Sequence, residues 1–129
     1  MRKLRFIRWW LSIGWILVGI VVFLSLTPSP PDLALGVPEG DKLGHLLAYM
    51  VVMFWFGCIY LPGRSYESIG IGFIFMGFIL ELLQGLTGHR TMEWADMVAN
   101  TMGVAIGRLL AWTRVSGMLT ALERRLLAL

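Results

Sequence analysis

The chain has 129 residues, of which 57% are hydrophobic and only 15% are charged. Soluble domains average about 45–50% apolar and about 25% charged residues, so this composition departs from them in the direction of membrane proteins. The net charge of +3 does not indicate nucleic-acid binding, because the bases flank apolar runs and form no continuous patch. A single cysteine, Cys58, excludes an intrachain disulfide.

Four apolar segments follow one another, at about residues 6–26, 43–61, 69–86 and 94–112. Each is close to the roughly 20 residues that a helix needs to cross the hydrocarbon core of a bilayer. A segment within lipid must be helical, because no water is present to satisfy an open backbone. The connections are short and carry Pro or Gly. The sequence therefore predicts an all-α membrane protein, with one domain over residues 1–129 and a bundle of four transmembrane helices.

The basic residues predict the orientation of this bundle. If the N-terminus is cytoplasmic, that side holds every Lys and Arg except Lys42 and Arg90. We therefore expect a multi-pass protein of the plasma membrane with both termini in the cytoplasm and the 27–42 and 87–93 loops outside. The first segment exceeds the about 7–15 apolar residues of a signal peptide and lacks a cleavage site, so we expect a retained helix.

Residues 114–128 follow a different pattern. Apolar residues recur near helical spacing, whereas most polar ones, Glu123 and Arg124 among them, lie elsewhere on the helical wheel. The pattern predicts a short amphipathic helix on the cytoplasmic leaflet, with Glu123 and Arg124 on a solvated face. A frayed soluble tail is the alternative.

Polar side chains occur at matching depths in three of the predicted helices. Residues three or four apart share a helical face. The shared faces are those of Asp41, His45 and Tyr49 in the second segment, Glu81 and Gln84 in the third, and Asp96 and Asn100 in the fourth. All lie within about two turns of the predicted outer surface, so we expect one polar pocket that opens outward.

Glycines accompany these polar faces. Gly77 and Gly85 lie four residues on either side of Glu81, and Gly103 and Gly107 follow Asn100 on nearly the same face. Small residues at this spacing let membrane helices approach closely. We therefore expect the four glycines to lie at helix contacts.

An acid inside a membrane span is costly, and such acids are usually functional. Glu81 is thus the leading candidate for a general base, a metal ligand or a headgroup acceptor, with His45 and Asp96 as further catalytic candidates. The alternative is that Glu81 only joins helices, held by Arg90 or His45. His45 is either a proton shuttle or a packing residue. Asp41 either orients the ring of His45 or, as we favour, caps the helix start.

These residues also carry a family resemblance. Asp-Lys-x-x-His-x-x-x-Tyr at 41–49 resembles the opening motif of the VanZ-like membrane proteins. Glu81-x-x-Gln84, Arg90 and Asp96-x-x-x-Asn100-x-x-Gly103-x-x-x-Gly107 are similar to the rest of the family pattern, over about residues 24–110. The family is named for a protein linked to resistance to the glycopeptide teicoplanin. The resemblance implies a fold and marked positions, and it implies no catalysed step. Glu93 departs from the pattern.

The first functional hypothesis is a site for an anionic amphiphile, such as a phospholipid or a lipid-linked envelope precursor. Arg90 and Lys42 would lie at its mouth, since both side chains suit phosphate or carboxylate. The expected ligand-binding residues are Asp41, Lys42, His45, Tyr49, Glu81, Gln84, Arg90, Asp96 and Asn100.

Two further hypotheses remain open. A hydrolase or transferase acting on a lipid headgroup could hold a divalent cation at Asp41, His45, Glu81 and Asp96. No compact metal motif is present, so we assign no metal and no cofactor from the sequence. The third hypothesis is an interaction protein whose polar residues only hold the bundle together.

Overall fold

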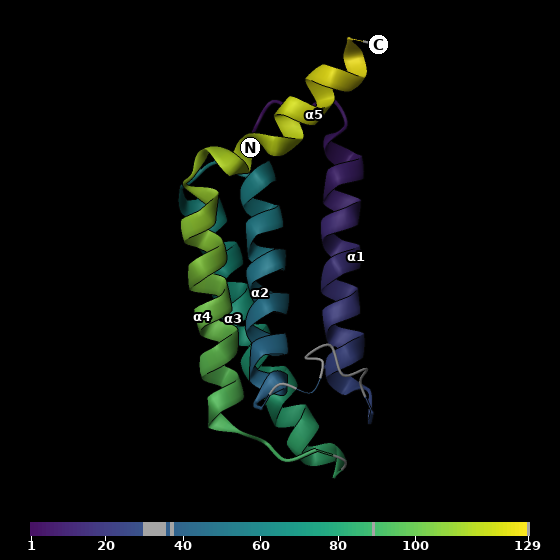
Figure 1. Cartoon of the computed structure of the whole chain (residues 1–129), viewed down its shortest axis with the longest axis vertical. Coiled ribbons are helices and arrows are strands. Elements are labelled where there is room, and N and C mark those ends of the chain that lie inside the picture. The colour runs from purple at the N-terminus through teal and green to yellow at the C-terminus, as the bar shows by residue number, and fades with distance from the viewer. Residues whose placement is uncertain (30–35, 37, 89, 129) are drawn as a thin grey trace.

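The computed structural model describes residues 1–29, 36, 38–88 and 90–128. The elements are α1 (Ile7–Leu26), α2 (Gly40–Ile59), α3 (Arg64–Thr87), α4 (Trp94–Ala111), a 3-10 turn η1 (Arg114–Gly117) and α5 (Met118–Leu127). The described residues contain no strand, so the predicted all-α class is confirmed for them. Figure 1 shows α1 to α4 running along the long axis, with α5 across one end.

Three of these helices, α1, α2 and α3, have the length and hydropathy of membrane spans. The fourth, α4, has 18 residues and carries Asp96, Asn100 and Arg108, so it is less apolar than the others. Hydropathy alone placed the start of α3 near residue 69, but the helix begins at Arg64. Its first turns hold polar residues that make specific contacts: the Tyr66 hydroxyl donates to the Met53 carbonyl, and Glu67 pairs with Arg108.

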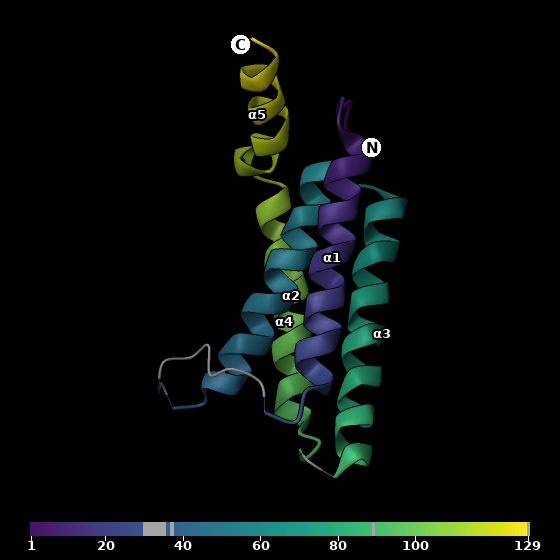
Figure 2. The same ribbon diagram turned by 90° about the vertical axis from the view of Figure 1, so that its right-hand side faces the viewer.

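The helix α2 lies at the centre and contacts α1, α3, α4, η1 and α5. Its most extensive contact is with α4, whose glycines face the α2 backbone. A Cβ atom on Gly103 or Gly107 would lie closer than 3.0 Å to the carbonyl oxygens of Leu46 and Met50, respectively. Figure 2 shows α1 in front of α2 and α4, with α3 to one side. This arrangement brings the inner faces of α2, α3 and α4 together.

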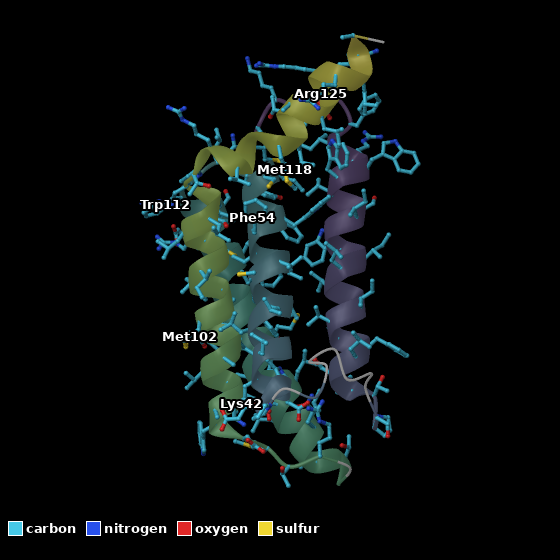
Figure 3. All side chains as sticks on the ribbon, viewed as in Figure 1. Lys42, Phe54, Met102, Trp112, Met118 and Arg125 are labelled. Atoms are coloured by element: carbon cyan, nitrogen blue, oxygen red, sulfur yellow. The ribbon has the colours of Figure 1, made fainter. Side chains whose placement is uncertain are left out.

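The bundle has two different ends. Figure 3 shows Lys42 at one end, near the connection between α3 and α4, and Trp112, Met118 and Arg125 toward the other. The N-terminus also lies near α5 (Figure 1). The end that holds Lys42 contains the polar residues singled out in the sequence.

The tail corrects one expectation. It is helical, with exposed Leu122, Leu126 and Leu127, but Glu123 does not lie on a solvated face: it is buried. Its carboxylate accepts hydrogen bonds from the backbone N–H groups of Arg5 and Phe6, at 2.7 and 2.8 Å. The wheel of one helix could not reveal this burial, because the donors belong to the other end of the sequence.

Candidate functional site

Four polar side chains from three helices converge at the Lys42 end of the bundle. We call His45 of α2, Glu81 of α3, and Asp96 and Asn100 of α4 the polar cluster. One ring nitrogen of His45 and one carboxylate oxygen each of Glu81 and Asp96 lie within 4.8 Å of one another. Glu81, Asp96 and Asn100 are only 1%, 5% and 3% exposed. The cluster is therefore a buried junction of α2, α3 and α4.

His45 lies between the two residues that α4 contributes to the polar cluster. Its Nδ1 lies 3.0 Å from Asn100 Oδ1, and its Nε2 lies 3.7 Å from Asp96 Oδ2. An amide oxygen can only accept, so Nδ1 carries a hydrogen that it donates to Asn100. The ring nitrogen that faces Asp96 is then Nε2. The other Asp96 oxygen, Oδ1, is buried and has no hydrogen-bond partner among the described residues.

Glu81 is held by a backbone group. Its Oε1 accepts a hydrogen bond of 3.0 Å from the N–H of Glu93, the residue that precedes α4. The sequence had suggested Arg90 or His45 as its partner. The hydrogen bond to the Glu93 N–H ties α3 to the start of α4, and one Glu81 oxygen lies within 4.8 Å of a His45 ring nitrogen.

Tyr49 lies beside the polar cluster, at the level of Gly77. A Cβ atom on Gly77 would meet both the Asn100 side chain, at 3.0 Å, and Tyr49 Oη, at 3.2 Å. The missing side chain of Gly77 therefore gives these two groups their room. Tyr49 Oη is buried without a hydrogen-bond partner among the described residues.

Other residues expected in the pocket lie outside the polar cluster. Asp41 is exposed in the first turn of α2, whose N-cap is Glu39, so the predicted capping by Asp41 is wrong. Gln84 is buried but donates from Nε2 to the Ser25 carbonyl of α1. Lys42 pairs with Glu93, at 3.2 Å. These groups surround the cluster or join it to other helices.

Arg90 belongs to a separate groove on the outside of the α3–α4 connection. The groove is lined by Leu82, Leu86, Met92 and Arg90 and has a volume of about 680 Å³. Gly85 also lines it, and the nearest atoms to a Cβ on Gly85 are those of Met92, in the connection. The same connection reaches the polar cluster through the N–H of Glu93. The groove and the cluster therefore share one segment of chain.

The model of the VanZ/LLP1 family matches residues 8–116. The chain belongs to the VanZ/LLP1 family. Membership in the VanZ/LLP1 family, together with the three long apolar helices, identifies a membrane protein. No curated protein and no solved structure matches the chain.

The matched region runs from α1 into η1 and so contains every member of the polar cluster. The resemblance noted from the motifs is thus confirmed at the level of the family. Two groups at the site had no signal in the sequence: the N–H of Glu93, which binds Glu81, and the carbonyl of Ser25, which binds Gln84. Both belong to the backbone, and every non-proline residue carries such groups.

Proposed function

We propose that this protein binds an anionic amphiphile at the outer face of the cell membrane, in the groove beside Arg90. In this proposal α4 is the fourth span, both termini are cytoplasmic, and the Lys42 end faces outward. The unequal distribution of Lys and Arg supports the orientation. The long contact between α4 and α2 supports a fourth span, as do the exposed apolar residues Val98, Met102 and Leu109 on α4.

The observation that carries the proposal is the composition of the groove. Leu82, Leu86 and Met92 offer an apolar surface for acyl chains, and Leu86 is 82% exposed. Arg90 adds a guanidinium, which suits the bidentate recognition of phosphate or carboxylate. An anionic amphiphile needs two features in its binding site: an apolar surface for its acyl chains and a cation for its headgroup. Lys42 contributes less than expected from the sequence, because it is paired with Glu93.

Phospholipids and lipid-linked envelope precursors both present an anionic headgroup at this level of the membrane. Membership in the VanZ/LLP1 family supports a role in the envelope and in the response to glycopeptide antibiotics. Such a role would follow if the protein held or shielded a headgroup of this kind.

Arg90→Ala should lower the binding of an anionic lipid at least tenfold, because the groove then keeps its apolar surface and loses its cation. The measurement is native mass spectrometry of the purified protein with phosphatidylglycerol and, separately, phosphatidylcholine. The matched control is Arg64→Ala, which removes an exposed arginine at the start of α3, on the opposite end. Unchanged phosphatidylglycerol binding by the R90A variant would contradict the proposal.

A further variant, at Glu81, separates a functional site from a purely structural role. If the polar residues only hold the bundle together, Glu81→Gln should lower thermal stability and cellular abundance in parallel with any loss of the glycopeptide-response phenotype. A phenotype lost at normal abundance supports a functional site. Abundance and phenotype that fall together support the interaction-protein alternative.

A further inference from the structure

We propose that the polar cluster binds one divalent transition-metal ion, of the Zn²⁺ or Mn²⁺ class, through His45 Nε2 and one carboxylate oxygen each of Glu81 and Asp96. The metal site itself stands on the geometry of the cluster. It is separate from the groove beside Arg90 and does not depend on the lipid proposed to bind there.

The donor set and its spacing fit such an ion. Imidazole nitrogen and carboxylate oxygen are ligands of Zn²⁺ and Mn²⁺. Bonds of about 2.1 Å in a tetrahedral site place neighbouring ligand atoms about 3.4 Å apart. His45 Nε2 and Asp96 Oδ2 are already 3.7 Å apart. One ring nitrogen of His45 and one carboxylate oxygen each of Glu81 and Asp96 lie within 4.8 Å of one another. A small rotation of the side chains therefore closes the site.

The second contact of His45 favours the same assignment. Histidines that bind metals usually donate their other ring N–H to a carbonyl or carboxylate, which fixes the tautomer and the ring orientation. The Nδ1–H group of His45 donates to Asn100 Oδ1 at 3.0 Å in this way. The lone pair of Nε2 is then directed at Asp96 Oδ2, another acceptor. Two acceptors that face each other need a cation between them.

Burial strengthens the requirement for a cation. Glu81 and Asp96 are both at least 95% buried, and Asp96 Oδ1 has no hydrogen-bond partner among the described residues. Buried carboxylates normally pair with a cation or bind a metal. The nearby Lys42 is engaged by Glu93, outside the cluster. The competing explanation is a proton on His45 Nε2, which would give an imidazolium paired with Asp96.

His45 is accessible enough for an ion to arrive, since its side chain is 11% exposed. Three protein ligands leave at least one coordination position open, as in catalytic zinc sites. In this protein the open position would take water.

Co²⁺ absorption is a direct test, because the d–d bands report the coordination of the ion. The purified protein in detergent, stripped with a chelator, should bind one Co²⁺ per chain, and Zn²⁺ should displace it. His45→Cys should add a near-ultraviolet thiolate-to-cobalt charge-transfer band. Asp96→Asn should abolish binding, and Asn100→Leu should weaken it about 10–100-fold. Glu67→Gln, which changes a carboxylate at the other end of the bundle, should leave binding unchanged.

No Co²⁺ or Zn²⁺ binding by the wild-type protein would overturn the metal site and leave the proton on His45 as the explanation. Equal binding by the wild-type and D96N proteins, with no charge-transfer band for H45C, would overturn it as well. The H45C band is a gain of signal, so it stays informative if D96N does not fold. Phosphatidylglycerol binding is measured on the same samples. Metal binding with an R90A variant that binds lipid normally contradicts only the proposed function, whereas Arg90-dependent lipid binding without metal contradicts only the ion.

Discussion

At the scale of single residues, Glu123 shows how a buried acid can be held without a salt bridge. It accepts hydrogen bonds from the N–H groups of Arg5 and Phe6 and from Trp10 Nε1, the last at 2.7 Å. Phe6 is the N-cap of α1 and has no capping side chain of its own. A carboxylate near a helix N-terminus also interacts favourably with the helix dipole. Glu123, in α5, thus binds the backbone N–H groups just before α1.

The hydrogen bonds of Glu123 predict a pH-dependent stability. Burial alone would raise the pKa of Glu123, but the hydrogen bonds from Phe6, Trp10 and Arg5 hold it below its usual value. A folded pKa below the unfolded one, about 4.3, gives stability above that pH, which is lost as the pH falls through the folded pKa. Glu123→Gln should therefore destabilise the protein by about 1–3 kcal/mol at pH 7, because it removes a charged acceptor.

The measurement is thermal unfolding in detergent at several pH values. The difference between the wild-type and E123Q proteins should narrow below about pH 4. Arg124→Ala changes the exposed neighbour of Glu123 and serves as the control, with an expected effect within about 0.5 kcal/mol. An E123Q protein as stable as the wild type at pH 7 would show that the negative charge of Glu123 does not stabilise the protein.

The polar cluster could be predicted at this scale because helical spacing and membrane depth are enough to bring His45, Glu81, Asp96 and Asn100 to one level. The partners of Glu81 and Gln84 could not be predicted, because they are backbone groups of Glu93 and Ser25. Asp41 was misassigned because α2 starts three residues before the apolar run, at Gly40. This extra turn moves Asp41 from the cap into the exposed first turn.

At the scale of helices, the contact between α2 and α4 depends on two glycines. A methyl group at Gly103 or Gly107 would meet the α2 backbone, which cannot move aside as a flexible side chain can. Gly103→Ala or Gly107→Ala should therefore separate the two helices and destabilise the protein by about 1–3 kcal/mol or more, as overpacked core substitutions do. Thermal unfolding and size-exclusion profiles in detergent measure the effect.

Gly72→Ala is the matched control. Gly72 lies in α3, and a Cβ atom there would meet nothing within 4 Å. This substitution should be neutral or stabilising by up to about 1 kcal/mol, since alanine favours a helix over glycine. Equal losses of stability in the G72A and G103A proteins would mean that close approach of α2 and α4 is not what Gly103 provides.

At the scale of the whole molecule, the proposed orientation predicts which end can be labelled from outside the cell. Thr91, in the connection between α3 and α4, and Arg125, in α5, are both exposed, and these two segments lie at opposite ends of the bundle (Figure 1). Thr91→Cys should react with a membrane-impermeant maleimide in intact cells, whereas Arg125→Cys should react only after lysis. The wild-type protein is the control, because its one thiol, on Cys58, is 0% exposed. Labelling of R125C but not T91C in intact cells would reverse the orientation.

The helical class could be predicted because hydropathy and length leave few alternatives for a chain this apolar. Hydropathy does not identify α4 as a membrane span, because the residues that build the polar cluster also lower the hydropathy of this helix. The docking of α5 was out of reach, since it depends on Glu123 meeting donors 118 and 117 positions away in the sequence. Periodicity within one segment carries no information about so distant a partner.

The contact between Glu123 and the start of α1 also has a consequence for biosynthesis. Residues 5 and 6 leave the ribosome more than a hundred residues before their acceptor does. Until then, water or lipid headgroups must satisfy the N–H groups of Arg5 and Phe6, just before α1. Insertion of α1 into the bilayer can precede this step, but the seal between the two ends of the sequence can form only after residue 123 has been translated. A ribosome stalled before that codon would therefore hold a chain whose first helix still lacks this contact.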